Sequence, residues 1–341
     1  MSPSHSNEAL LSVKSLGTAF PTHDGLVRAV ADVSFSVLPG RTTALVGESG
    51  SGKSVTSLTL MGLLPKDCGA QTTGRADFLC RDGRRVDLLS LPARQARALR
   101  GNEIAMIFQE PMTSLNPVLT IGEQIAESLR LHKGLDRAAA LAAAKRMLEL
   151  VEIPAAGQRL HEYPHQLSGG MRQRVMIALA MACEPRLLIA DEPTTALDVT
   201  IQAQILALMG RLQRETGMSM LFITHNLGVV AHHADQVVVM YAGRVVESAP
   251  VRPLFAAPQH PYTQGLLNCL PAKARKPGEP RPKRLFAIRG QVASPLAPPP
   301  GCAFEPRCDR AEARCREAMP ALLAQASAER QARCIHVEEW V

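Results

Sequence analysis

The 341-residue chain is 46% hydrophobic and 20% charged, a balance typical of globular proteins, and its length favours about two domains. Only 4% of the residues are aromatic, which argues against a surface that stacks nucleic-acid bases. The net charge of +7 suits nucleic acid, an anionic membrane surface or a nucleotide, so charge alone does not choose among these partners.

The sequence predicts neither a membrane span nor a secretory signal. The longest apolar run, residues 175–183, is far too short to cross a bilayer. The first residues lack a basic stretch followed by an apolar one. We therefore expect a cytoplasmic protein whose 8 cysteines are thiols or metal ligands, not disulfides.

Short strands are expected at the start of the chain. Residues 26–30 and 33–37 are rich in β-branched and apolar side chains, and Pro39-Gly40 is typical of a turn. Residues 42–46 then form a short apolar run, which indicates a buried strand.

A phosphate-binding loop follows this strand. Residues 47–54 read Gly-Glu-Ser-Gly-Ser-Gly-Lys-Ser, and residues 55–64 have the apolar spacing of a helix that packs on a sheet. Glycines let successive N–H groups point at phosphate oxygens, and the helix adds its positive N-terminal end. A chance Gly/Ser-rich turn is the alternative, and the strand–loop–helix context argues against it. The predicted nucleotide-binding residues are Gly47, Ser49, Gly50, Ser51, Gly52, Lys53 and Ser54.

Within this loop, two side chains have distinct expected roles. Lys53 would lie against the β- and γ-phosphates, and the hydroxyl of Ser54 would coordinate Mg²⁺.

Strands and helices alternate through the rest of the first 255 residues. A small antiparallel piece is expected within residues 72–100, with a turn at residues 82–83, and helices dominate residues 120–162. Further strands are predicted at residues 104–108, 187–190 and 220–224, a helix at residues 138–151, another at residues 201–212, and a hairpin at residues 237–246. Apolar strands spaced by helices indicate an α/β fold with a mostly parallel, covered sheet.

The strand at residues 187–190 ends in two carboxylates. Asp191 is placed to hold Mg²⁺ through water, and Glu192 to polarise an attacking water. The alternative role, capping the next helix, is less favoured because the phosphate loop is present.

A second phosphate-type site is predicted at residues 167–174. Ser168, Gly169 and Gly170 open a helix there with a hydroxyl and accessible backbone amides. An ordinary serine cap is the alternative. Because one nucleotide needs only one cradle, the second one suggests a nucleotide shared between two subunits.

These motifs, in this order, resemble the ATP-binding-cassette (ABC) ATPases over residues 8–255. Gln109 matches the Q-loop, residues 195–198 the D-loop, and His225 the switch histidine. The resemblance extends to the ATPase subunits of oligopeptide and dipeptide importers, and the segments that carry it are residues 47–49, 112–117, 163–165, 227–230 and 260–263, together with the cysteine-bearing tail. It implies a P-loop NTPase fold with an antiparallel β subdomain, a helical signature subdomain and a small C-terminal extension.

The resemblance also implies roles for single residues. Gln109 would contact Mg²⁺ or the attacking water, and His225 would orient the γ-phosphate and Glu192. Asp198 would cross the dimer interface, and Phe20 would stack on adenine unless it belongs to the core. Ser168, Gly169 and Gly170 would complete the ATP site of the opposing subunit. One departure is Asn226, where many relatives have Asp.

By the same resemblance, residues 8–255 form the nucleotide-binding domain, with a helical subdomain at about residues 111–166, and residues 256–341 form the extension. The expected partners are two membrane permease subunits bound near Gln109 and residues 112–117, a second ATPase subunit in a heterodimer, and indirectly an extracytoplasmic solute-binding protein. The protein would then lie peripherally on the cytoplasmic face of the inner membrane.

Other functions fit the chain less well. DNA-repair relatives carry a coiled coil or zinc insertions between loop and signature, translation-associated relatives carry two cassettes, and this chain has neither, so no nucleic-acid partner is expected. A metabolic kinase would leave the signature unexplained. The expected solute is a dipeptide or oligopeptide, with nickel complexes and glutathione left open.

The C-terminal part begins with a basic, proline-rich stretch at residues 271–284. This composition is typical of a solvated linker, and a phosphate or membrane-surface contact is the alternative.

Four cysteines follow this stretch: Cys302, Cys308, Cys315 and Cys334. Their spacing lacks the tight pairs of structural zinc sites. Four thiolates are the ligand set of an iron–sulfur cube, and tails similar to this one in the importer family are associated with a [4Fe–4S] cluster. Zinc and a metal-free tail remain alternatives.

Overall fold

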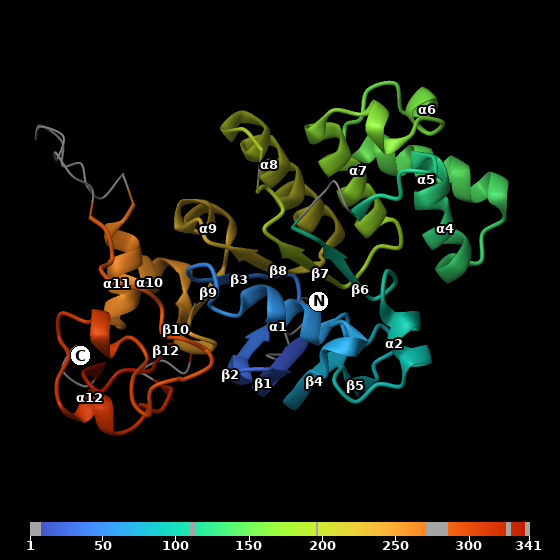
Figure 1. Ribbon diagram of the computed structural model, residues 1–341. Helices are drawn as coiled ribbons and strands as arrows, with labels where there is room; N and C mark the ends of the chain where they lie inside the picture. Colours follow the sequence, from blue (N-terminus) through green and yellow to red (C-terminus); the bar gives the residue numbers. More distant parts are fainter. Residues whose placement is uncertain (1–7, 110–113, 196, 271–285, 325–328, 338–341) are drawn as a thin grey trace, which may run out of the picture.

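A computed structural model of the chain describes residues 8–109, 114–195, 197–270, 286–324 and 329–337. Its centre is an 8-stranded sheet with the strand order β11-β12-β10-β9-β3-β8-β7-β6 (Figure 1). The strands β9, β3, β8, β7 and β6 run parallel, and β10 returns antiparallel to β9. Their bounds are β3 (Thr42–Val46), β6 (Ile104–Ile107), β7 (Leu187–Asp191), β8 (Ser219–Thr224), β9 (Gln236–Tyr241) and β10 (Arg244–Pro250). The predicted α/β fold with a mostly parallel sheet is confirmed.

The central strands are covered on both faces. Every residue of β3, β7 and β8 is buried, which explains why these segments read as continuous apolar runs without alternation. Since the carboxyl ends of parallel strands meet at one edge, the residues that follow β3, β7 and β8 come together there.

One face of this sheet packs against α1 (Lys53–Leu60) and a 4-stranded antiparallel sheet of order β2-β1-β4-β5. The strands are β1 (Leu11–Thr22), β2 (Gly25–Val37), β4 (Gln71–Leu79) and β5 (Arg85–Asp87). The two strands expected at residues 26–30 and 33–37 are one strand, β2. Asp32, at φ +55°, adds a bulge between them and so breaks the apolar alternation.

The antiparallel region also contains a helix that was not expected, α2 (Ala93–Leu99), beyond the short 3₁₀ turn η1 (Lys66–Cys68). None of the residues of α2 is buried, so the sequence carried no apolar period to predict it.

The other face of the central sheet is covered by helices, and those of the helical layer gather at the β6 end (Figure 1). Thr120 and Asp136 accept backbone hydrogen bonds at the starts of α4 and α5, as good N-caps do. The helices are α4 (Ile121–Lys133), α5 (Arg137–Leu150), α6 (Ala156–Arg159), the 3₁₀ turn η2 (Pro164–Gln166), α7 (Gly169–Met181), α8 (Val199–Thr216) and α9 (Leu227–His233). In the described part of the chain, no helix is both long and apolar enough to cross a bilayer.

The C-terminal extension lies at the opposite end of the sheet, beside β10 (Figure 1). Its β12 pairs with β10, so the extension continues the central sheet. The short helix α10 (Val251–Ala256) leads into the extension. The elements of the extension are α11 (Pro261–Asn268), the 3₁₀ turn η3 (Glu305–Arg307), α12 (Arg314–Glu317), β11 (Leu323–Ala324) and β12 (Gln331–Ala332). The basic stretch expected to be a linker, residues 271–284, and the start of the permease segment, residues 112–113, lie outside the described residues.

Candidate nucleotide-binding site

The phosphate loop connects β3 to α1 and is crowded by backbone from two other strands. A Cβ atom at Gly47 would overlap the carbonyl oxygen of Met240, and one at Gly52 would overlap that of Ala29. Gly52 also has φ +95°, a conformation that strains other residues. Ser49 and Gly50 are exposed at the rim of the loop. The glycines therefore let the loop curl tightly against its neighbours.

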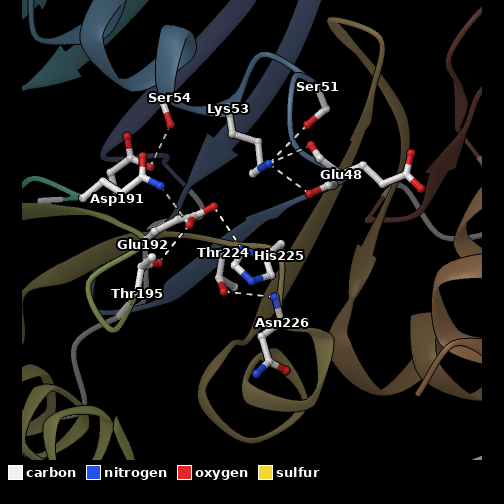
Figure 2. A network of polar contacts seen from close by, with 12 residues as sticks. Glu48, Ser51, Lys53, Ser54, Asp191, Glu192, Thr195, Thr224, His225 and Asn226 are labelled. Carbon is white, nitrogen blue, oxygen red and sulfur yellow. Dashed lines mark hydrogen bonds and ion pairs between the residues drawn. The ribbon is translucent and has the colours of Figure 1, made fainter. Parts of the chain in front are cut away.

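Lys53 points into this loop and is only 5% exposed. Its Nζ donates to the carbonyl oxygens of Gly47 at 2.9 Å and Glu48 at 3.0 Å, and lies 3.4 Å from the hydroxyl of Ser51 (Figure 2). Burial lowers the pKa of Lys53, while the nearby carboxylates, Glu192 first, act to raise it. The loop thus holds a cation where an anion would bind.

Asp191 lies at the tip of β7 and faces the first turn of α1. Its Oδ1 accepts a hydrogen bond from the hydroxyl of Ser54 at 3.1 Å, and its Oδ2 one from Ser57 at 3.1 Å. Burial raises the pKa of Asp191, and the two hydroxyls oppose that rise. A carboxylate and a hydroxyl at this distance are the oxygen ligands that Mg²⁺ prefers.

Sequence reasoning missed Ser57 in this arrangement. It follows Ser54 by three positions, so the two hydroxyls share one face of α1. That spacing was the signal that could have found it.

Glu192 is the meeting point of the predicted catalytic residues. Its Oε1 lies 3.2 Å from Nδ1 of His225, and its Oε2 accepts from Gln109 Nε2 at 3.2 Å. The hydroxyl of Thr195 also donates to Oε2, at 2.9 Å (Figure 2). The sequence placed Thr195 in a motif but assigned it no contact with Glu192.

Two further properties distinguish Glu192. Its backbone has φ +47°, a left-handed conformation that is costly for a side-chain-bearing residue and that clusters at functional sites. Burial would raise the pKa of the Glu192 carboxyl, but hydrogen bonds from His225 and Thr195 outweigh it and lower the pKa. The group therefore stays ionised near neutral pH, as a base must.

Comparisons with known proteins agree with this arrangement. The family model described as ABC transporter matches residues 30–195, and the one described as the C-terminal region of oligopeptide/dipeptide transporters matches residues 246–315. A Brucella melitensis protein named for peptide import is 53% identical over 339 residues, covering 98% of this chain and 99% of its own. The chain belongs to the ABC transporter ATPases of the oligopeptide/dipeptide family.

Other relatives of this ATPase subunit agree in sequence and in fold. The dipeptide transport ATP-binding protein of Bacillus subtilis is 50% identical over 313 residues, covering 92% of this chain and 90% of its own. The structure of a dimeric bacterial ABC transporter cassette matches with a TM-score of 0.61 at 25% identity, over 71% of this chain and 99% of that one. The family accounts for ATP and Mg²⁺ as the ligands of the site, and the donors described above fit both.

The signature residues of the subunit open α7, a helix that packs on the edge strand β6. Ser168 is the exposed N-cap of α7, where its hydroxyl accepts from the N–H of Met171 at 3.3 Å, with Gly169 and Gly170 in the first turn. α7 packs on α4, α5 and β6. β6 is separated from β3 by two strands, a span of roughly 14 Å at about 4.8 Å per strand.

The remaining predicted residues lie at element ends or edges. Asp198 caps α8 by accepting from the N–H of Ile201 at 2.9 Å, and Ala196, beside it in the D-loop, lies outside the described residues. Phe20 is half-buried near the end of β1, opposite Val27. Asn226 caps α9 with its side-chain oxygen, so the residue that departs from the family pattern retains the capping role open to Asp.

The four tail cysteines of the subunit line a single cavity of about 20 Å³, together with Phe304 and His260. The four are Cys302, Cys308, Cys315 and Cys334. Burial raises the pKa of Cys302 and Cys308, and raises that of Cys334 to about 11. Within the described ranges, no three His, Cys, Asp or Glu side chains converge closely enough to hold one metal ion.

Proposed function

We propose that this subunit hydrolyses ATP to power the import of peptides through a membrane permease. The observation that carries the proposal is the contact of His225, Gln109 and Thr195 with Glu192, directly beside the phosphate loop. A protein that bound nucleotide without hydrolysing it would need the phosphate loop. It would not need an ionised, hydrogen-bonded carboxylate beside that loop.

In the hydrolytic step, Glu192 accepts a hydrogen bond from water and takes its proton as the oxygen attacks the γ-phosphorus. The bond from that phosphorus to the bridging oxygen breaks, and ADP leaves. His225 contacts one oxygen of that carboxylate, and Gln109 and Thr195 donate to the other, so together they fix the orientation of the base. Lys53 and the loop N–H groups stabilise the charge that develops on the phosphate. Ser54 and Asp191 would hold Mg²⁺, which when bound would supply further charge neutralisation.

The active unit in this proposal is a pair of ATPase subunits. The separation of Ser168 from the subunit's own loop supports a signature that serves the nucleotide of the partner. Asp198, exposed at the start of α8, would contact the partner across the interface. A heterodimer with a second, similar ATPase is the arrangement we propose, and Phe20 would stack on the adenine.

The proposed partners are two permease subunits, which dock near Gln109 at the cytoplasmic face of the inner membrane, and an extracytoplasmic solute-binding protein. The match of residues 246–315 to the oligopeptide/dipeptide type supports a peptide as the solute. The division that we propose is a nucleotide-binding domain at residues 8–255, with its helical subdomain at about residues 111–166, and an extension from residue 256. Glutathione and nickel complexes are the competing solutes.

The experiment is transport by the assembled complex. The subunit, its partner ATPase, both permeases and the binding protein are reconstituted in vesicles, and uptake of labelled dipeptide, glutathione or nickel is measured with ATP supplied on the ATPase side. Dipeptide uptake that depends on ATP supports the proposal. Uptake of glutathione or nickel without uptake of dipeptide would show that the proposed substrate is wrong. ATP hydrolysis without uptake of any solute would contradict the importer role.

We also propose that the four tail cysteines hold a [4Fe–4S] cluster. Four thiols from separate turns that line one cavity are the donor set for such a cluster. The cluster would crosslink η3, α12 and the segment after β12, a structural role in an extension with little apolar core. Since the cavity is small, these segments would spread outward around the cluster.

A further inference from the structure

Arg307 of the C-terminal extension contacts the phosphate loop. Nη1 of Arg307 lies 2.7 Å from Oε2 of Glu48, and Nη2 lies 3.1 Å from Oε1. Glu48 is the second residue of the loop, and 259 positions separate the two residues in sequence. Two parallel N–H···O bonds between charged groups form the strongest common type of side-chain pair.

Arg307 is held firmly on its own side of this contact. Its side chain is 5% exposed, and its Nε donates to the carbonyl oxygen of Arg289 at 2.8 Å. Its guanidinium carbon lies 5.7 Å from the ring centre of Tyr241 and 5.8 Å from that of Phe304. The hydrogen bonds to Glu48 raise the pKa of Arg307 above its already high value. The arginine is therefore a fixed positive charge.

A second contact ties the same loop residue to the extension. The backbone N–H of Glu48 donates to the hydroxyl of Tyr262 in α11 at 2.8 Å. The Tyr262 ring packs against Tyr241 and Phe304, with centroids 4.7 Å and 5.4 Å apart. Both the side chain and the backbone of Glu48 are thus held by groups packed in one aromatic cluster.

The carboxylate of Glu48 would otherwise disturb the nucleotide site. Glu48 belongs to the short loop that would bind the phosphates. Its backbone carbonyl oxygen accepts a hydrogen bond from Nζ of Lys53, the cation of that loop. A free carboxylate there would repel a triphosphate and compete with it for Lys53. Paired with Arg307, the carboxylate is turned toward the extension and its charge is neutralised.

We propose that Arg307 is a positioning residue of the ATP site, which holds Glu48 away from the phosphates and fixes the start of the loop. The proposal rests on ATP binding by this loop. The proposal makes the extension part of the nucleotide site, because Arg307 lies in η3, a turn of the extension between Cys302 and Cys308.

The test compares Arg307→Gln, Glu48→Gln and the double variant in the full-length chain, with ATP·Mg²⁺ titrated calorimetrically. Arg307→Gln should raise the dissociation constant of ATP by about tenfold, because it leaves a carboxylate unpaired beside the phosphates. Glu48→Gln should raise the dissociation constant of ATP by less, because the variant has no carboxylate at residue 48 to repel the phosphates. The double variant should bind like Glu48→Gln, so that the second change suppresses most of the first.

Arg316→Gln is the matched control, since Arg316 pairs with Glu305 in the same extension at 2.8 Å but is 74% exposed. It should bind ATP like the wild type. Arg307→Lys, which keeps the charge but not the fork, should lie between wild type and Arg307→Gln. In the assembled transporter, the Arg307→Gln change should appear in KM and leave kcat within about twofold.

Several results would overturn the proposal. One is wild-type affinity in folded Arg307→Gln; another is a double variant as weak as Arg307→Gln, which would indicate a general loss of tail structure. Should Arg307→Gln fail to fold, equal affinity of Glu48→Gln and wild type would count against a positioning role. A wild-type chain that binds no ATP would instead refute the nucleotide site itself.

Discussion

His225 Nδ1 lies 3.2 Å from Oε1 of Glu192, although 33 positions separate the two residues. Glu192 follows β7 and His225 follows β8, and these strands are parallel neighbours in which Asp191 pairs with Ile223. The sheet register alone therefore places the imidazole beside the carboxylate. Because the contact spans two strand ends, a shift of either strand would break it and change the orientation of the base.

Replacing Glu192 by Gln should leave ATP binding intact and reduce hydrolysis by about 10²- to 10⁴-fold, since an amide cannot accept the proton of the attacking water. The assembled complex should then stall as a closed, ATP-bound dimer. The measurements are ATP binding and steady-state turnover.

The matched control for this variant is Lys53→Ala, which should bind ATP poorly because it removes the buried cation of the loop. Near-normal turnover in Glu192→Gln would contradict the assignment of the base.

Ser168→Arg should suppress hydrolysis at the partner's site and leave ATP binding by the mutated chain unchanged. The reason is that Ser168 caps α7, which packs on the edge strand β6, whereas the chain's own loop follows β3. Single-turnover hydrolysis in complexes with one mutated subunit measures this. If the isolated wild-type chain were as active as the transporter, and Ser168→Arg had no effect, the shared-site arrangement would be wrong.

Protein purified without oxygen should be brown and contain iron and sulfide in about a 1:1 ratio if the tail cysteines hold a [4Fe–4S] cluster. Changing Cys302, Cys308, Cys315 or Cys334 to Ser should bleach it. Cys68→Ser is the matched control, because Cys68 lies in η1, away from the cavity. Colourless protein with stoichiometric zinc, or a folded tail without metal, would exclude the cluster.

His260 should make the folded state less stable at mildly acidic pH. It is 1% exposed, its Nδ1 accepts from the N–H of Tyr262 at 3.1 Å, and burial lowers its pKa to about 3 from 6.5. Between these values the unfolded chain binds a proton that the folded chain does not. Stability should therefore fall as pH falls below 6.5, by at most about 1.4 kcal/mol per pH unit for one proton.

Urea unfolding between pH 7 and pH 5 measures this slope. His260→Asn keeps an N-cap on α11 but removes the titrating ring, so its slope should be shallower than that of the wild type. An identical slope in both proteins would show that His260 contributes nothing to the pH dependence.

Much of the site could be predicted because its chemistry depends on short segments. The loop of residues 47–54, the acids after β7 and the helix cap at Ser168 each need particular residue types at fixed spacing, so they are legible without a structure. The buried strands were equally legible, since a parallel sheet covered on both faces requires unbroken apolar runs. By contrast, α2 buries no side chain, so its sequence has no apolar periodicity from which the helix could be predicted.

The pairing of Arg307 with Glu48 depended on the tertiary structure alone. The local sequence of neither residue predicts the contact. They meet because Phe304, at the start of η3, packs against Tyr241 of β9 and Tyr262 of α11 and so brings Arg307 to the loop. The sequence by itself determined the motifs, the parallel sheet and the family. The fold decided which distant charges neutralise each other, because contact between residues so far apart depends on strand order and packing, not on spacing.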